Sequence, residues 1–500
     1  MKTNHNQPTA HDNFTLASRL AGAVWGHLVG DAAGVPYEFG PPMPAKDVVF
    51  DHTGSHHQPP GTWSDDGALM LALLDSLLTV GFDPEDQGRR AVAWRDERAY
   101  TPDNEGRFDI GGATRDALRN LSSGTPAIDA GRTDDHSCGN GSLMRILPVA
   151  LVGRDLSANE LIDRAHQASR VTHGHPRCQV ACALYCLAVV ALLAGKSPDK
   201  ALLGAFDTAG ALYRAEAGYE AHLAALAEFN NWSERSGRGF VIDSFWSSWD
   251  AFAGAADYAD AIRRAIGYGN DTDTTAAIAG GLAGAYWGWD AIPLAWRRGM
   301  RGREVAQPLV DQLVEGVGAK TSRVSPLRVN VMPLGGTALE GTGQLGITFL
   351  PGKKHDGYTG LHWRNLDADL ARLRELGVDT LFLLVEDSEL EFTHVPELPD
   401  VMAAQGPELI RFPVRDPRTP ADGVAYRAAV LDLIARVKAG QHVAIACRGG
   451  MDRSGMTAAC IYRELGLSAD AAIARVQAHR SHTITLRDQQ DFVRAWPPTV

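Results

Sequence analysis

The spacing of apolar residues divides the chain into two parts. From Phe14 to Val317, apolar side chains recur every three or four residues, as in 69–78 and 274–286, and this is the period of one helix face. Beyond Leu345, short runs rich in β-branched and aromatic residues alternate with helical segments. The first part is therefore predicted to be all-α, and the second a small α/β domain with a parallel central sheet.

The boundary between the two parts has a different composition. Residues 318–344 are rich in Pro, Gly, Ser and Thr, which interrupt helices, so we expect a linker there. The pattern thus predicts a multidomain chain with an all-α domain at 14–317 and an α/β domain at 345–500. In the second domain we expect strands at 345–350, 378–385 and 442–446, with helices around 366–376 and 426–438.

Net charge and hydropathy narrow the class of protein. The chain has 60 acidic and 48 basic side chains and a net charge of -12, which repels a nucleic-acid backbone, so we expect no duplex nucleic-acid partner. The longest apolar run, residues 180–194, is short for a bilayer span, and the amino terminus is polar without a signal-type apolar segment. We therefore expect no membrane association and a cytoplasmic location.

The cysteines do not indicate a disulfide framework, because there are only six in 500 residues. Cys178, Cys182 and Cys186 recur every fourth residue along one predicted apolar helix. Free cysteine packs as a small hydrophobic residue, so we interpret this row as core filling. A soft-metal site is the alternative.

A loop with the chemistry for phosphate follows the predicted strand 442–446. The loop reads Cys447-Arg448-Gly449-Gly450-Met451-Asp452-Arg453-Ser454-Gly455. Its backbone N–H groups and the dipole of the helix that follows would bind an anion. The same field favours the thiolate form of Cys447 as a nucleophile, and Arg453 can donate two hydrogen bonds to phosphoryl oxygens. The hydroxyl of Ser454 could help the thiolate leave in a second step.

The segment from about Leu345 to Phe492 resembles the cysteine-dependent dual-specificity and tyrosine phosphatases, especially their cyclin-dependent-kinase-inhibitor-3-like branch. The resemblance implies that the C-x5-R-S/T loop, residues 447–454, binds phosphate with residues 448–452. It implies hydrolysis of a phosphomonoester, on a protein or a small molecule, through a phosphocysteine.

The same resemblance assigns further residues in this segment. Asp416, in the sequence FPVRD, would be the general acid, although an Asp before a Pro is also a common turn residue. Either Gln489 or Gln490 would position the hydrolytic water. Many members have His before the cysteine where this chain has Ala446, so the loop and Arg453 are left to favour the thiolate.

Two acidic clusters precede apolar helices in the first domain. One is Ser64-Asp65-Asp66 and the other is Asp271-Thr272-Asp273-Thr274. Helix capping explains either cluster alone. Together they offer four carboxylates and several hydroxyls, whose like charges would be destabilising unless cations neutralise them. If the two helices meet, this oxygen-only set predicts a paired site for magnesium, calcium or manganese.

The segment from about Leu16 to Val317 resembles the ADP-ribosylglycohydrolases, including the dinitrogenase-reductase-activating type. The family's G-D-x-x-G-x-x-x-E matches residues 30–38 and ends at Glu38. Its metal motifs match Ser64, Asp65 and Asp66, and Asp271, Asp273 and Thr274. The resemblance implies an all-helical fold with two Mg²⁺ ions, or Mn²⁺ in their place. It implies cleavage of the bond between ADP-ribose and a modified protein or small molecule.

The resemblance also suggests how the cleft is lined. The general base would be Asp66 or Glu38, and Glu38 would gate the cleft or contact the metal. One departure is Gly67, where the family often has Thr. We interpret the loop histidines His52, His56 and His57 as solvated. The residues expected to bind substrate are Asp109, Gly111, Gly112, Gly141, Ser142, Met144 and His173.

The two sites together predict a bifunctional hydrolase. The first domain would release ADP-ribose with magnesium, and the second would remove phosphate through Cys447. The alternative is a regulatory protein that binds ADP-ribose or phosphate with one or both sites inactive.

Overall fold

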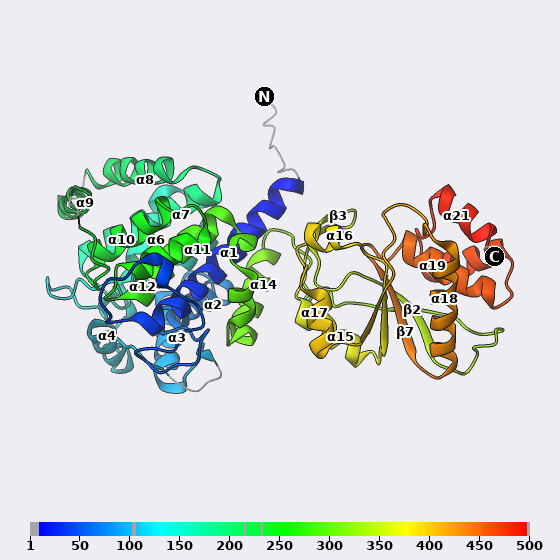
Figure 1. The fold of residues 1–500 in the computed structure, drawn as a ribbon. Coiled ribbons are helices and arrows are strands. Elements are labelled where there is room, and N and C mark those ends of the chain that lie inside the picture. Colours follow the sequence, from blue (N-terminus) through cyan, green and yellow to red (C-terminus); the bar gives the residue numbers. More distant parts are fainter. Residues whose placement is uncertain (1–9, 103–106, 215–216, 232–233, 498–500) are drawn as a thin grey trace, which may run out of the picture. The chain divides into compact units, whose positions relative to one another are not determined.

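The structure is a computed structural model that describes residues 10–102, 107–214, 217–231 and 234–497 (Figure 1). The chain forms two compact units, residues 1–317 and 318–500. The first unit is all-helical among its described residues, as predicted. Its α-helices are α1 Ala10–Gly34, α2 Asp65–Thr79, α3 Pro84–Glu97, α4 Gly112–Ser122, α5 Leu147–Val152, α6 Ala158–Arg170, α7 Pro176–Leu193, α8 Pro198–Tyr213, α9 Ala217–Phe229, α10 Val241–Ala253, α11 Tyr258–Gly267, α12 Thr272–Trp287, α13 Leu294–Gly299 and α14 Arg303–Glu315.

Helices α1 and α12 pack with their backbones almost in contact. A Cβ atom on Gly26 would lie 2.4 Å from the Gly280 carbonyl oxygen, and one on Gly280 would lie 2.2 Å from that of Gly26. Glycine is therefore required on both sides of this crossing. The packing brings the carboxyl-terminal end of α1, which carries Asp31, beside the first turn of α12, which carries Asp273.

Helix α7 carries the three regularly spaced cysteines. Cys178, Cys182 and Cys186 are fully buried free thiols, which confirms that they fill the core. Among the described residues, α7 is the one helix long and apolar enough to cross a membrane, and most of it is buried inside the first unit.

The second unit is built on a five-stranded sheet of order β1-β2-β7-β5-β6. β1 is antiparallel to β2 and the other neighbours are parallel, so the predicted α/β fold with a mainly parallel sheet is confirmed. The strands are β1 Asn330–Met332, β2 Gln344–Phe349, β5 Thr380–Leu383, β6 Glu408–Arg411 and β7 His442–Cys447, and a separate hairpin consists of β3 Lys354–Gly357 and β4 Gly360–Trp363.

Helices cover both faces of this sheet (Figure 1). One face is covered by α15 Leu366–Glu375, α16 Asp387–Phe392 and α17 Leu398–Gln405. The other is covered by α18 Gly423–Lys438, α19 Asp452–Glu464, α20 Ala469–His479 and α21 Arg487–Arg494. Phe349 pairs with Cys447 at the carboxyl ends of β2 and β7, which is the edge where parallel sheets place their ligands.

Residues 318–344, predicted to be a linker, are part of the second unit instead. They supply β1, and the side chains of Leu327, Met332 and Leu339 are buried in its two cores. The Pro and Gly residues there break helices, but they do not prevent a short edge strand and buried anchors.

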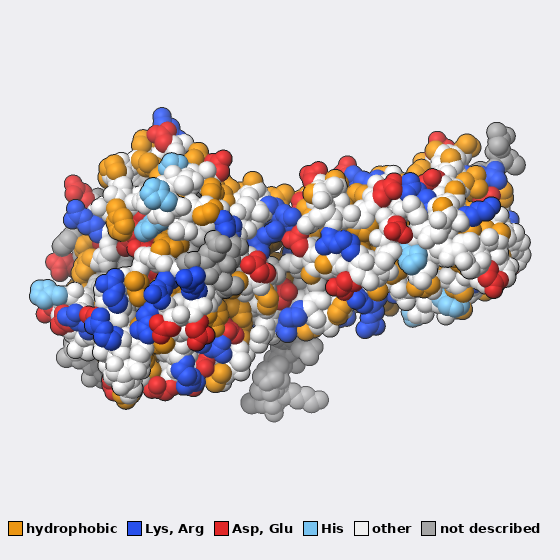
Figure 2. All heavy atoms as spheres, turned by 90° about the horizontal axis from the view of Figure 1, so that it is seen from below, with side chains coloured by type: hydrophobic (Ala, Val, Ile, Leu, Met, Phe, Trp, Pro, Cys, Tyr) orange, Lys and Arg blue, Asp and Glu red, His pale blue; other side chains and the backbone are white. Residues whose placement is uncertain are grey.

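On the face seen in Figure 2, basic and acidic side chains are interspersed over both units.

Candidate active sites

The two acidic clusters of the first unit meet at the amino-terminal ends of α2 and α12. The Ser64 hydroxyl caps α2 by accepting a hydrogen bond of 3.2 Å from the Asp66 amide. The Thr274 hydroxyl, in the first turn of α12, donates to the carboxylate of Asp66 at 3.3 Å. Asn140 donates to Asp271 at 2.8 Å. The two helices therefore come together, which is the condition under which the sequence predicts a paired metal site.

Asp31 fixes the turn before α2. Its carboxylate accepts hydrogen bonds from the backbone N–H groups of Ser64, at 2.9 Å, and Gly67, at 2.7 Å. Burial raises the pKa of Asp31 to about 7, although these hydrogen bonds oppose the shift. Asp31, in the last turn of α1, therefore orients the acidic turn at the start of α2.

The clustered carboxylates lack positive partners among the described side chains. One oxygen each of Asp65, Asp66 and Asp273 is buried without a hydrogen bond. Burial, followed by the charges of neighbouring carboxylates, raises the pKa of each of the three well above its usual range. Buried carboxylate oxygens need a cation or a proton, and this oxygen donor set fits a hard divalent cation.

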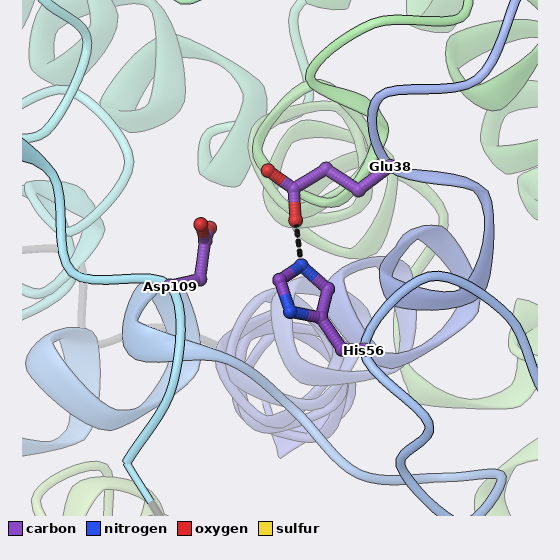
Figure 3. A group of neighbouring side chains, drawn as sticks. All are labelled: Glu38, His56 and Asp109. Carbon is purple, nitrogen blue, oxygen red and sulfur yellow. Dashed lines mark hydrogen bonds and ion pairs between the residues drawn. The ribbon is translucent and has the colours of Figure 1, made fainter.

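Glu38 lies beside this cluster and is joined to His56 by a short hydrogen bond (Figure 3). The Asp109 carboxylate faces both from a separate loop (Figure 3), and single ligand atoms of the three residues lie within 4.8 Å of one another. A second group within the same distance is Glu38, Asp271 and Asp273. Burial, and then the charge of Asp109, raises the pKa of Glu38 to about 9.

The prediction that His56 is solvated is wrong, whereas His52 and His57 are exposed as predicted. The His56 ring packs 5.9 Å from that of Phe39 and 5.0 Å from that of Phe108. No local pattern in the sequence distinguishes His56 from its neighbours, because its partners come from other segments.

A cavity of about 600 Å³ opens above the carboxylates. Ser142, expected to bind substrate, does not line it, because its hydroxyl is buried against Ser169 at 2.9 Å. Of the predicted site residues, those that line the cavity are Glu38, Asp65, Asp66, Asp109, Gly111, Gly112, Gly141, Met144, His173, Asp271 and Thr274.

A neutral histidine and an exposed arginine also line the cavity. Burial, and then the charge of Arg145, lowers the pKa of His173 to about 3, so its imidazole is neutral. Arg238 is exposed and brings a positive charge to the cavity, a residue that the sequence motifs did not indicate. His175 caps α7 by accepting from the Arg177 amide at 3.1 Å.

In the second unit, Cys447 ends β7 and the loop after it leads into α19. The Cys447 side chain is almost fully buried at the base of a cavity of about 520 Å³. Gly450 has a φ of +63°, and a Cβ atom there would lie 2.5 Å from the Thr348 carbonyl oxygen. Glycine is therefore required for the loop to turn against β2. The cavity is also lined by Arg448, Gly449, Met451, Asp452, Arg453 and Asp416.

Arg453 is held by a carboxylate that the sequence motifs did not indicate. Its guanidinium donates two hydrogen bonds of 2.7 Å to the two oxygens of Glu389, in α16. Burial alone would raise the pKa of Glu389, but these bonds hold it below its usual range. The pair fixes the guanidinium beside Cys447 while Arg453 itself is buried.

The remaining predicted residues of this site surround the loop. Asp416 pairs with Arg448 at 2.7 Å and with Arg453 at 3.3 Å. Asp452 accepts from the Thr485 amide at 2.8 Å. The Ser454 hydroxyl is buried and makes no hydrogen bond in the described part of the chain.

The structure separates the two candidate glutamines, both of which lie outside the lining of this cavity. Gln489 is buried and donates to the Pro417 carbonyl at 3.3 Å, next to Asp416. Gln490 donates to the Ile484 carbonyl at 2.9 Å.

Residues 12–323 match the sequence model of the ADP-ribosylglycohydrolase family. The chain belongs to this family. Its glycohydrolase unit is 29% identical to ADP-ribosylarginine hydrolase Tri1 of Serratia proteamaculans, over 59% of this chain and 78% of that protein. It is 28% identical to the ADP-ribosyl-dinitrogen-reductase glycohydrolase of Rhodospirillum rubrum, over 58% of this chain and 90% of that protein.

A solved structure supports the same fold for the glycohydrolase unit. An ADP-ribosylglycohydrolase-related protein complex aligns with 60% of this chain and 98% of that chain, with 33% identity and a TM-score of 0.50. Residues 320–476 match the sequence model of cyclin-dependent kinase inhibitor 3 (CDKN3). The second unit is therefore similar to the CDKN3-type phosphatase domains.

The family often has Thr at the position of Gly67, and the structure gives a steric reason for glycine in this chain. A Cβ atom at Gly67 would lie 2.8 Å from Leu28 and from the ring of Trp63. A threonine does not fit unless these side chains move. The Gly67 amide instead donates to Asp31.

Proposed function

We propose that the first unit hydrolyses the glycosidic bond between ADP-ribose and a modified protein or small molecule, with two Mg²⁺ ions. The observation that carries the proposal is the group of buried carboxylate oxygens of Asp65, Asp66 and Asp273 that have no hydrogen-bond partner. A cavity of about 600 Å³ above them has room for a nucleotide-sized ligand. Membership of the ADP-ribosylglycohydrolase family supports the same function.

The residues that would hold the cations are Ser64, Asp65, Asp66, Asp271, Asp273 and Thr274. Bound divalent cations would supply a polarised water and orient the ribose hydroxyls. Asp66 and Glu38 both line the cavity, and one of them would take the proton from the water that attacks the anomeric carbon. Arg238 would pair with the diphosphate, because it brings an exposed positive charge to the same cavity.

Release of ADP-ribose tests this proposal. The names of the two relatives above state ADP-ribosylarginine and ADP-ribosylated dinitrogen reductase as what they act on, so ADP-ribosylarginine is the first substrate to use. ADP-ribosylserine and a phosphopeptide would be run beside it, each with Mg²⁺, with EDTA, and with Mg²⁺ restored. We expect ADP-ribose release that EDTA abolishes and Mg²⁺ restores. Binding without release in all samples would favour the alternative, a regulatory ADP-ribose-binding protein.

We propose as a second activity that the phosphatase-like unit hydrolyses phosphomonoesters through a phosphocysteine on Cys447. The specific observation that favours it is Arg453, which Glu389 holds with two hydrogen bonds of 2.7 Å beside the cysteine. The loop N–H groups and Arg453 would bind the phosphoryl group, and Asp416 would protonate the leaving oxygen. A regulatory phosphate-binding domain is the alternative.

The test of this activity is turnover of p-nitrophenyl phosphate by the full chain. Replacing Cys447 by Ser should remove turnover and keep phosphate binding, since Arg453 and the loop remain. The matched control is Cys460→Ser, because Cys460 is a buried free thiol in α19, outside the phosphate loop. Appreciable turnover by Cys447→Ser would show that Cys447 is not the nucleophile.

A cytoplasmic location stays a prediction, supported by the six free thiols.

A further inference from the structure

A second cation lies buried beside Cys447. The Lys353 side chain is 4% exposed, and its ammonium donates to the Arg448 carbonyl oxygen at 3.1 Å. The same nitrogen lies 4.8 Å from the centroid of the Phe349 ring, and Phe349 pairs with Cys447 across the β2–β7 ladder. Lys353 and Cys447 line the same cavity. The ammonium therefore lies where the phosphate loop leaves the sheet.

Lys353 differs from the two arginines of the phosphate loop in having no carboxylate partner. Arg448 pairs with Asp416, and Arg453 pairs with Glu389. Within the described residues, no carboxylate lies at ion-pair distance from the Lys353 ammonium. Burial lowers the pKa of Lys353 to about 8, although the Cys447 sulfur opposes the shift. Lys353 is thus mostly cationic at neutral pH, and a buried cation is stable only beside an anion.

We propose that Lys353 is a positioning residue for Cys447. The Lys353 ammonium stabilises the Cys447 thiolate, and it takes the place of the histidine that many related phosphatases carry before the cysteine. The proposal rests on the second proposed activity. In this chain the preceding residue is Ala446, which is fully buried among aliphatic side chains. The bond from Lys353 to the Arg448 carbonyl also holds the backbone at the start of the phosphate loop.

The other charged groups around Cys447 are already engaged. Arg480 donates to the Gly450 carbonyl at 3.0 Å, at the other end of the loop, and like Lys353 it has no carboxylate at ion-pair distance in the described part of the chain. Asp452 is held by Thr485. Arg364, which also lies close to the Phe349 ring, pairs with Asp369 at 2.6 Å.

Two histidines of the β3–β4 hairpin also face this cavity. Burial lowers the pKa of both His355 and His362. They therefore bring little positive charge at neutral pH. Three cations that line this cavity, Lys320, Lys353 and Arg480, have no carboxylate at ion-pair distance among the described residues. Of these, Lys353 is the one whose hydrogen bond goes to the residue directly after Cys447.

The test measures how fast iodoacetamide alkylates Cys447 in the full chain between pH 5 and pH 9. The thiolate is the form that reacts, and mass spectrometry of the Cys447 peptide separates it from the other thiols. We expect Lys353→Met to slow alkylation about tenfold at pH 6 and less than about twofold at pH 9, where the thiolate forms without help. Lys353→Gln keeps a donor for the Arg448 carbonyl but has no charge, so it should behave like Lys353→Met. Lys353→Arg should stay within about twofold of the wild type.

Lys354→Met is the matched control, because the Lys354 ammonium donates to the Gly352 carbonyl at 3.3 Å and Lys354 does not line the cavity. It should leave the alkylation profile unchanged. A wild-type profile in Lys353→Gln would overturn the proposal, as would a Lys353→Arg profile like that of Lys353→Gln. Alkylation reads the thiolate without turnover. If the wild type failed to hydrolyse p-nitrophenyl phosphate while the alkylation shifts appeared, the phosphatase activity would fail and the role of Lys353 would stand.

Discussion

The Thr274 hydroxyl donates a hydrogen bond of 3.3 Å to the Asp66 carboxylate, across 208 residues of sequence. This contact joins the first turns of α2 and α12, where buried carboxylates gather without cations among the described side chains. The helix dipoles stabilise part of this negative charge. The unpaired oxygens of Asp65, Asp66 and Asp273 show that the dipoles do not satisfy all of it.

Metal removal should destabilise the glycohydrolase unit more at alkaline than at acid pH. Burial raises the pKa of Asp31 to about 7 and that of Glu38 to about 9. Without metal, the folded state therefore binds more protons than the unfolded state from about pH 4 up to these values, so stability falls as pH rises through that window. Thermal melting in EDTA should show a lower midpoint at pH 8 than at pH 6, and Mg²⁺ should raise the midpoint more at pH 8. An equal effect of Mg²⁺ at both values would contradict this electrostatic picture.

The two activities should be separable by single substitutions. We expect Asp273→Asn to abolish ADP-ribose release, because Asp273 is fully buried within the carboxylate cluster, while phosphatase turnover stays within a few-fold of the wild type. Asp155→Asn, at an exposed aspartate of the same unit, is the control and should change neither activity. Loss of phosphatase turnover in Asp273→Asn would argue against two independent sites.

His56→Ala should weaken the glycohydrolase by freeing Glu38. The His56 ring is the partner that holds the Glu38 carboxylate (Figure 3), so its loss should slow ADP-ribose release by about tenfold with the metal affinity nearly unchanged. His57→Ala is the matched control, because His57 is exposed on the same loop. Equal rates in the two variants would mean that the hydrogen bond between His56 and Glu38 has no part in the reaction.

Glu389→Gln should impair the phosphatase through Arg453. The substitution replaces a bidentate carboxylate with a neutral amide that can accept only one of the two hydrogen bonds. We expect kcat/KM for p-nitrophenyl phosphate to fall by about 10²-fold, with weaker binding of phosphate. Glu391→Gln on the exposed side of α16 should have no such effect. A wild-type affinity for phosphate in Glu389→Gln would show that Arg453 does not need this support.

The role of Asp416 can be tested with leaving groups of different basicity. A general acid contributes about 10²- to 10⁴-fold when the leaving oxygen is basic, as in tyrosine, whose pKa is about 10. Asp416→Asn should therefore slow phosphotyrosine hydrolysis by this order and slow p-nitrophenyl phosphate much less. Equal slowing of the two substrates would leave Asp416 with a structural role in holding Arg448 and Arg453.

The sequence predicted those parts of the sites that lie on one segment. The loop from Cys447 to Ser454 and the acidic turns before α2 and α12 are local patterns of strand, turn and helix, and each lies where its pattern indicated. The all-α and α/β fold classes also followed from local periodicity.

The contacts between segments could not be predicted in this way. His56, Glu389 and Lys353 are ordinary surface-type residues in sequence, and each acquires its role from a partner far along the chain. Ser142 shows the converse, since it lies within a motif but faces Ser169 rather than the cavity. The segment 318–344 was predicted to be a linker because it is rich in Pro, Gly, Ser and Thr. The few apolar residues that anchor it form no periodic pattern in the sequence.

We propose that the carboxylates of α2 and α12 bind divalent cations that ADP-ribosyl hydrolysis requires. The most direct measurement titrates Mn²⁺ into the metal-free full chain, follows bound Mn²⁺ by electron paramagnetic resonance, and assays release of ADP-ribose from ADP-ribosylarginine in the same samples. The account predicts two bound ions, release that rises with their occupancy, and loss of both in Asp273→Asn. Full ADP-ribose release by the metal-free chain, or tight Mn²⁺ binding that Asp273→Asn leaves intact, would contradict it.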